Sequence, residues 1–186
     1  MITAPTLHTE RLVLRPFKLE DAPDVQRFAG DRDVASTTCA IPHPYEDGMA
    51  EEWISTHQPD FEKGTGINLA ITFKDTEKTE DTILIGAIGL GIDLTEKIGE
   101  LGYWVGKPYW NSGYCTEAAK AILTYAFDVL ELTSIHAFYF KRNPASGRVL
   151  EKIGMQFEEC FPKGVEKWGV LEDLVKYSIQ NKTDNS

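Results

Sequence analysis

The sequence has few cysteines, few positive charges and no long apolar segment, and each shortage excludes a class of protein. Its three cysteines, Cys39, Cys115 and Cys160, are odd in number and form no C-x-x-C pair, so we expect reduced thiols rather than disulfides or a zinc site. No apolar run approaches the roughly 18 residues that a membrane span needs, and the first residues lack the basic and apolar parts of a signal peptide. These absences predict a cytoplasmic protein with no membrane partner and no bound metal.

Positive charge is scarce along the whole chain. There are 19 Lys and Arg against 29 Asp and Glu, which gives a net charge of −10. Surfaces that bind nucleic acid need clustered Lys and Arg against the phosphates, so we expect no nucleic-acid partner. The acidic balance instead favours a cationic acceptor, such as an amine, through long-range attraction. An anionic cofactor would then depend on a local positive site, which oriented backbone amides can supply.

Apolar residues are present in ordinary amounts and in regular patterns. The chain has 186 residues, 42% of them hydrophobic and 26% charged, and we expect one domain over 1–186 with a polar tail from about 181. Alternation predicts strands at 12–17, 67–73, 83–90, 98–105 and 134–140, with closing strands near 157–179. Amphipathic patterns predict helices at about 20–29, 45–57, 116–130 and 143–153, and residues 74–81 read as a charged turn. Gly86 and Gly89 lie inside a predicted strand, where they indicate a bulge or a close backbone approach.

The turn from Trp110 to Thr116 connects a predicted strand to a predicted helix. Gly113 can adopt a positive φ and bring its backbone close to a ligand, and the following helix opens with N–H groups that lack an intrahelical partner. These features suit a phosphate or pyrophosphate. The turn is neither a P-loop nor a dinucleotide fingerprint, because G-K-[ST] and G-x-G-x-x-G are both missing. Taken alone, it fits a plain strand-to-helix connection equally well.

A carboxylate lies on the predicted strand before this turn. Ile98, Glu100, Gly102 and Trp104 share one face of the strand, and a charge in the middle of a sheet is costly unless it is paired or protonated. Glu100 is therefore either a salt-bridged or solvated strand end, or a general base whose pKa is raised by partial burial.

Five motifs together resemble one family. They are Thr9-Glu-Arg-Leu-x-Leu-Arg-Pro16, Glu100-Leu-Gly-Tyr-Trp104, Trp110-x-x-Gly-Tyr-Cys-Thr-Glu-Ala118, Asn143-x-x-Ser-x-x-Val-Leu-x-Lys-x-Gly-Met155 and Asp173-Leu-Val-x-Tyr-Ser178. The chain resembles the Gcn5-related N-acetyltransferases (GNAT), and within them the branch with the ribosomal-protein N-terminal alanine acetyltransferases. The resemblance covers nearly the whole chain. It implies a mixed α+β fold, in which a twisted, mostly antiparallel sheet of about seven strands is flanked by about four helices and splays at the acetyl-CoA cleft.

The resemblance also implies roles for individual residues. Glu100 would take the proton of the acceptor amine through water, Asn143 would bind the pantetheine arm, and the hydroxyl of Ser146 would lie near the sulfur. The pantetheine amides would bind the backbone of the strand end, and the pyrophosphate would bind the amides of the turn. These backbone positions are Trp104, Val105 and Gly106 for the arm and Trp110, Asn111, Ser112, Gly113, Tyr114, Cys115 and Thr116 for the pyrophosphate.

The sequence departs from the family pattern at three places. Leu150 stands at the position where many relatives outside this branch have a Tyr that acts as the general acid. The resemblance therefore leaves Ser146 or water as the proton donor to the thiolate. Cys115 replaces a small Gly or Ala, and Asn111 replaces a Gly. Because the turn acts through its backbone, neither replacement need abolish binding. Asn143 and Ser146 are also common helix caps, and capping remains the alternative to their functional roles.

The acceptor site is expected to be formed by loops and by aromatic side chains. We expect residues 36–44, 45–57 and 161–168 to line it, with Trp53 and Trp168 as walls, and we interpret His57 and His136 as ordinary structural residues. The resemblance favours a protein or peptide N-terminal α-amine. A small amine, an amino-sugar antibiotic, or a non-catalytic acyl-CoA-binding module are the alternatives, and the chain is expected to be a monomer or a homodimer.

Overall fold

A single mixed sheet forms the centre of the molecule. The computed structural model describes residues 3–74 and 83–181, so the expected charged turn, apart from Lys74, and the tail from Lys182 lie outside the described residues. Within the described ranges, eight strands form one sheet in the order β1-β2-β3-β4-β5-β6-β8-β7. The strands are β1 (Leu7–His8), β2 (Leu12–Pro16), β3 (Gly66–Phe73), β4 (Leu84–Asp93), β5 (Ile98–Val105), β6 (Ser134–Phe140), β7 (Gln156–Lys167) and β8 (Val170–Gln180).

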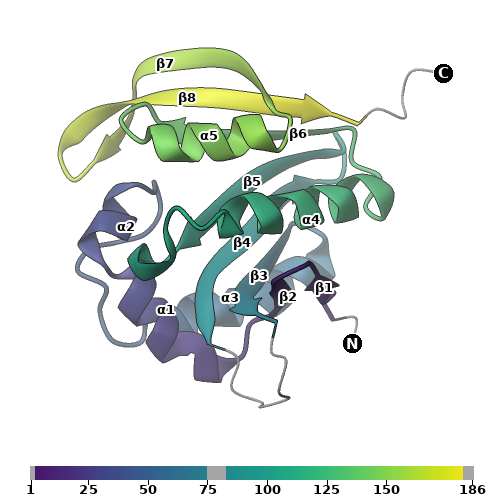
Figure 1. Ribbon diagram of the computed structural model, residues 1–186. Helices are drawn as coiled ribbons and strands as arrows, with labels where there is room; N and C mark the ends of the chain where they lie inside the picture. Colours follow the sequence, from purple (N-terminus) through teal and green to yellow (C-terminus); the bar gives the residue numbers. More distant parts are fainter. Residues whose placement is uncertain (1–2, 75–82, 182–186) are drawn as a thin grey trace.

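Helices cover both faces of the sheet (Figure 1). The α-helices are α1 (Ala22–Ala29), α2 (Arg32–Ser36), α3 (Met49–Lys63), α4 (Tyr114–Asp128) and α5 (Pro144–Lys152), and two short 3₁₀ turns are η1 (Leu19–Asp21) and η2 (Lys107–Tyr109). Buried apolar residues of α4 and α5 pack on one face with the larger core cluster. Those of α1, α2 and α3 pack on the other face with a second cluster that includes Trp104. None of the described helices is long and apolar enough to cross a bilayer.

The expected fold class is confirmed, with small differences in the elements. Among the described residues there is one strand and one α-helix more than expected, because β1 has only two residues and α2 only five, too few for a sequence pattern to reveal. The helix expected at 45–57 is α3, which starts at Met49 after Gly48 (φ 88°) and continues to Lys63 before Gly64 (φ 70°). These left-handed glycines set its ends.

Gly86 and Gly89 of β4 lie where the backbone irregularity and the close approach expected from the sequence are found. A Cβ added at Gly86 would lie 2.3 Å from the carbonyl oxygen of Trp104, and one at Gly89 would lie 2.2 Å from Oδ1 of Asn68. The register with β3 also shifts between Ile71 and Thr72, opposite this part of β4. Both a bulge and a close backbone approach are therefore present.

The sheet opens between β5 and β6. All neighbouring strands are antiparallel except this pair, which is parallel over only three residue pairs and ends at Glu100↔His136. Beyond it, β5 continues to Val105 while still paired with Gly86 of β4, and β6 continues to Phe140 paired with β8. The two strands therefore diverge (Figure 1). We call the opening beyond Glu100 and His136 the split.

Candidate active site

Backbone groups of β5 line one side of the split. The Gly106 N–H donates to the Ile85 carbonyl at 2.8 Å, so alternation in the antiparallel ladder turns the backbone groups of Val105 and Tyr103 away from β4 and toward the split. The Val105 carbonyl accepts from Nε1 of Trp110 at 2.7 Å. The strand end thus offers an edge that can pair with the amides of an extended ligand.

The start of α4 lies beyond that strand end and has free backbone donors. Gly113 has φ 80° and Asn111 has φ 60°, the left-handed conformation that Asn tolerates better than most residues. Among the residues that the structure describes, no hydrogen-bond acceptor is found for the N–H groups of residues 111–116. A helix N-terminus adds partial positive charge to such groups, so the expected anion site has the necessary geometry.

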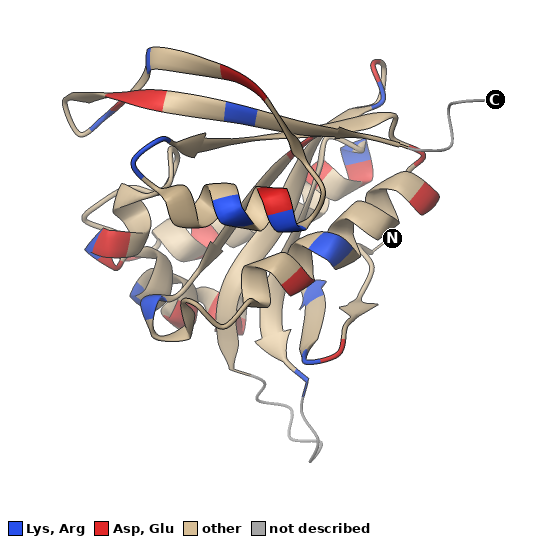
Figure 2. Ribbon diagram, turned by 45° about the horizontal axis from the view of Figure 1, so that its top comes forward, with Lys and Arg blue, Asp and Glu red and all other residues tan. Residues whose placement is uncertain are grey.

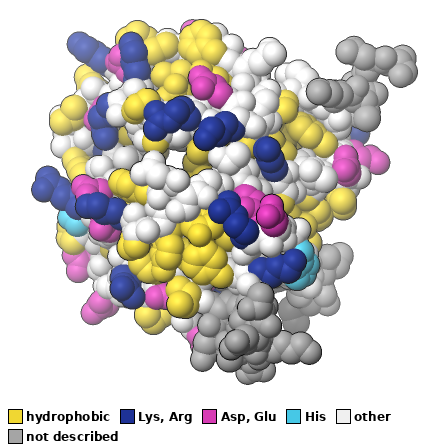
Figure 3. Space-filling model, viewed as in Figure 1, with side chains coloured by type: hydrophobic (Ala, Val, Ile, Leu, Met, Phe, Trp, Pro, Cys, Tyr) yellow, Lys and Arg dark blue, Asp and Glu magenta, His cyan; other side chains and the backbone are white. Residues whose placement is uncertain are grey.

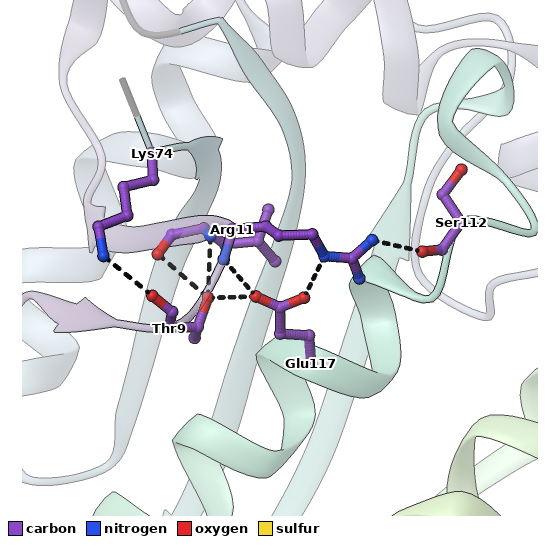
Figure 4. Close-up of polar contacts among 6 residues, drawn as sticks. Thr9, Arg11, Lys74, Ser112 and Glu117 are labelled. Carbon is purple, nitrogen blue, oxygen red and sulfur yellow. Dashed lines mark hydrogen bonds and ion pairs between the residues drawn. The ribbon is translucent and has the colours of Figure 1, made fainter. Parts of the chain in front are cut away.

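Residues of the turn between β1 and β2 form hydrogen bonds with the start of α4 (Figure 4). Arg11 donates from Nη1 to the Ser112 carbonyl at 3.0 Å and from Nε to Oε2 of Glu117 at 2.7 Å. Its backbone N–H and the Thr9 hydroxyl both donate to Oε1 of Glu117, at 2.7 and 2.6 Å. Burial alone would raise the pKa of Glu117, but the hydrogen bonds from Thr9 and Arg11 outweigh it and lower the pKa.

Glu100 lies at the point where the split begins. Its Oε2 is 3.3 Å from Nε2 of His136, its side chain is 61% exposed, and that of His136 is 22% exposed. The hydrogen bond with His136 lowers the pKa of Glu100, and partial burial opposes this only in part. The expected raised pKa is therefore wrong: the split lets water reach the carboxylate, and a histidine on the neighbouring strand pairs with it.

Ser146 and Asn143 lie on the opposite side of the split from Glu100. The hydroxyl groups of Ser146 and Tyr103 are 2.9 Å apart, and the Tyr103 hydroxyl is also 3.1 Å from the Ser146 carbonyl. Burial raises the pKa of Tyr103, so its hydroxyl stays protonated. Asn143 is the N-cap residue of α5, yet its side chain makes no capping hydrogen bond. Capping therefore does not explain the Asn143 side chain.

A cavity of about 1050 Å³ connects Glu100 with Ser146, and Asn143 is not among its lining residues. It lies against α1, the loop 37–42 and α3, and it reaches across the sheet to the split. Among its lining residues are Trp53, Glu100, His136, Tyr103 and Ser146. Residues of the loop and of α3, Trp53 among them, line this cavity.

The charged side chains of the cavity all have the same sign. The lining residues that the structure describes include Glu52, Asp60, Asp93 and Glu100, and they include neither Lys nor Arg. Such a lining attracts a cation and repels an anion. The cavity therefore suits an amine better than it suits the phosphates of a cofactor.

Trp168 lies outside this cavity. It is 45% exposed, and no residue of the segment 161–168 is among the lining residues. Nζ of the neighbouring Lys167 donates to the Ile41 carbonyl at 2.6 Å. The segment 161–168, which we expected in the acceptor pocket, thus does not line this cavity, and the β7–β8 hairpin contacts the loop 37–42 instead.

Charges of both signs lie on the helices that cover the other side of the sheet (Figure 2). Lys120, Arg148 and Lys152 of α4 and α5 are balanced by Glu117, Asp128 and Glu151 of the same helices. Figure 3 shows Lys and Arg side chains spread over this face, although the whole chain has a net charge of −10. The side-chain charges of α4 and α5 therefore balance, whereas the charged residues among the described cavity lining are all carboxylates.

Sequence and structure comparisons identify the family. A sequence model of the acetyltransferase (GNAT) domain matches residues 11–156. The chain belongs to the GNAT family. The Bacillus subtilis protein named uncharacterized N-acetyltransferase YnaD is 36% identical to this GNAT chain over 165 residues, which cover 86% of the chain and 90% of that protein.

Two further proteins are similar to this GNAT chain, one over about half of its length and the other over nearly all of it. The putative ribosomal N-acetyltransferase YdaF of B. subtilis is 35% identical over 100 residues, 53% of this chain and 55% of that protein. The structure of the ribosomal L7/L12 α-N-protein acetyltransferase RimL in complex with coenzyme A superposes with a TM-score of 0.84 at 16% sequence identity. The match covers 97% of this chain and 100% of RimL, which shows a shared fold. The GNAT chain is accordingly an acetyl-CoA-dependent N-acetyltransferase.

Two residues of the site were not predicted from the sequence as functional. His136 reaches Glu100 only because β6 runs parallel to β5 at this point, and no local pattern specifies that pairing. Tyr103 belongs to the quoted Gly-Tyr-Trp motif, but its contact with Ser146 joins residues 43 positions apart. A signal for either would have required the strand order.

Proposed function

We propose that this GNAT chain transfers the acetyl group of acetyl-CoA to the N-terminal α-amine of a protein or peptide, directly and within a ternary complex. The observation that carries the proposal is the acidic cavity, which opens onto Glu100 at the split and has no Lys or Arg among its described lining residues. A free α-amine is a cation until it loses its proton, with a pKa near 8. The names of YdaF and RimL, which both refer to ribosomal acceptors, support a protein substrate.

The donor would approach from the face of α4 and α5. Amides of residues 110–116 would hold the pyrophosphate, and the backbone at Trp104, Val105 and Gly106 would pair with the pantetheine arm, with Asn143 on the opposite side. The thioester would then lie in the split between Glu100 and Ser146, since both line the same cavity. The acceptor would approach through that cavity from the α1–α3 face. Holding both reactants in one place supplies most of the acceleration.

The chemistry needs a proton acceptor, a site for the oxyanion and a proton donor. Glu100, ionised because of its lowered pKa, would bind the ammonium and accept its proton through water. The freed amine attacks the thioester carbon, and the Val105 N–H would stabilise the oxyanion. The C–S bond then breaks as the amine loses its second proton to water. Ser146 would protonate the departing thiolate. Its hydroxyl would recover a proton that passes from solvent water through the Tyr103 hydroxyl, which lies 2.9 Å away and is itself reprotonated by that water.

Comparison of N-terminal peptides by mass spectrometry, from cells with and without the protein, tests the acceptor. We expect one or a few N-termini to lose acetylation in its absence and to regain it when purified protein and acetyl-CoA are added. If every N-terminus keeps its acetylation, the protein acceptor is wrong. A screen of small amines and amino sugars for release of free CoA then identifies the alternative acceptor. Binding of acetyl-CoA without turnover in that screen would favour the non-catalytic module.

A further inference from the structure

The first turn of α4 contains a carboxylate where an anion is expected to bind. Glu117 lies one turn after Gly113, and one guanidinium contacts both its carboxylate and the Ser112 carbonyl, at 2.7 and 3.0 Å. A negative side chain suits the positive end of a helix. An uncompensated carboxylate this close to the 111–116 amides would, however, repel a pyrophosphate.

Arg11 compensates this charge, and its guanidinium is held in one position. Nε bonds Glu117, Nη1 bonds Ser112, and the guanidinium carbon lies 4.7 Å from the centre of the Tyr114 ring (Figure 4). The hydrogen bond with Glu117 raises the pKa of Arg11, while that of Glu117 is lowered. Both groups are therefore ionised at neutral pH, and the pair carries no net charge.

The contact with Ser112 has a second effect. A carbonyl oxygen that faced the ligand would oppose an anion, and Arg11 holds this one from the side of the β1–β2 turn. The neighbouring N–H groups of residues 111–116 are left without described acceptors. Nη2 of Arg11 also lies beside the loop, 3.5 Å from where a Cβ on Gly113 would be.

We propose that Arg11 is a positioning residue for the cofactor: it cancels the charge of Glu117 and turns the Ser112 carbonyl aside, so that the 111–116 amides present a net positive site to the pyrophosphate. This inference rests on the proposed placement of acetyl-CoA at the start of α4. It gives the segment at residues 9–12 a part in the cofactor site, about 100 positions away in the sequence.

Titration of CoA into four proteins, measured by calorimetry, tests the proposal: wild type, Arg11→Gln, Glu117→Gln and the double variant. In about 50 mM salt, where charge is weakly screened, we expect Arg11→Gln to raise the Kd at least about tenfold. The double variant should bind at least about threefold more tightly than Arg11→Gln, because it no longer carries the unpaired carboxylate. The difference between wild type and Arg11→Gln should shrink in about 0.5 M salt. If Arg11 and Glu117 only held the two segments together, the double variant would bind CoA no more tightly than Arg11→Gln, since it has lost both partners.

The chain contains a matched control pair. Arg142 donates to Glu172 at 2.7 Å and to the Ser36 carbonyl, with side-chain exposures of 41% and 16% for Arg142 and Glu172, against 45% and 16% for Arg11 and Glu117. Arg142→Gln should change the Kd less than about threefold. Arg11→Lys keeps the charge, and it should stay within about tenfold of wild type even if Arg11→Gln fails to fold.

The outcomes separate the inference from the proposed function. Arg11→Gln that binds CoA like wild type, or a double variant no tighter than Arg11→Gln, overturns the inference. If Arg11→Gln does not fold, Arg11→Lys weaker than wild type by more than tenfold overturns it. Wild-type protein that fails to bind CoA would instead overturn the placement of the cofactor.

Discussion

Glu100 keeps its charge because His136 lies beside it. The carboxylate is 61% exposed and accepts from the imidazole at 3.3 Å, and its pKa is lowered by that bond. It is therefore ionised throughout the range in which the acceptor amine changes its charge. The rate should rise with pH as the ammonium, rather than Glu100, loses its proton.

Glu100→Gln tests whether the Glu100 carboxylate accepts the proton, because it replaces one carboxylate oxygen by an amide nitrogen. The amide keeps the shape but cannot accept the proton, so kcat should fall about 10²-fold, most strongly at neutral pH where nearly all of the amine is protonated. Affinity for acetyl-CoA should hardly change. Initial rates from about pH 6 to 9 and calorimetry measure both, with Asp93→Asn as a control carboxylate of the same cavity. Rates equal to wild type over this range would exclude Glu100 as the base.

His57 gives a prediction about stability. His57 is 8% exposed, and neither ring nitrogen has a hydrogen-bond partner among the described residues. Its ring packs between those of Phe17 and Trp53, with distances of 5.0 and 4.4 Å between ring centroids. Burial lowers its pKa to about 4. The unfolded chain binds this proton near pH 6.5. Stability is therefore lost as the pH falls from about 6.5 to 4, by up to about 3 kcal/mol.

His57→Phe should remove this loss. Urea unfolding at about pH 7 and pH 4.5 should show the wild type losing about 2 kcal/mol more than the variant, with the exposed His8→Gln as a control that behaves like wild type. Equal losses of unfolding free energy in His57→Phe and wild type would mean that His57 has the same pKa in the folded and in the unfolded chain.

At the scale of secondary structure, the sequence reveals local features and not those that depend on strand order. Gly113 at a strand-to-helix turn indicates left-handed backbone, and it has a positive φ, as does Asn111, for which the sequence pattern made no such prediction. The strand patterns likewise locate β3, β4 and β5. The split itself depends on a parallel pairing between residues 98–100 and 134–136. That pairing decides which residues face Glu100, and it joins segments too far apart for any periodicity to report.

Gly113→Val tests the helix start as a cofactor site. The residue has φ 80° and precedes α4, so valine should strain the loop and withdraw its amides, raising the Kd of acetyl-CoA at least about tenfold. Gly48→Val is the matched control, because Gly48 has φ 88° at the N-cap of α3. Both variants should lose about 1–2 kcal/mol of stability, and only Gly113→Val should lose affinity. Unchanged binding in a folded Gly113→Val would contradict the assignment.

For the whole molecule, the sequence motifs give the family and the fold, while packing between distant segments decides the acceptor side. Trp53 is among the lining residues of the cavity. Trp168 has a similar aromatic side chain in a plausible segment, but the β7–β8 hairpin holds it outside. The same limit applies to charge. A net charge of −10 does not reveal that basic and acidic residues balance on α4 and α5 while carboxylates line the cavity.

The central claim is that donor and acceptor meet in the split from opposite faces of the sheet and react without a covalent enzyme intermediate. Initial rates measured while acetyl-CoA and an acceptor peptide are both varied test it most directly. We expect double-reciprocal lines that intersect, because both substrates must be bound before the acetyl group moves. Parallel lines, the pattern of a covalent acetyl-enzyme, would contradict it.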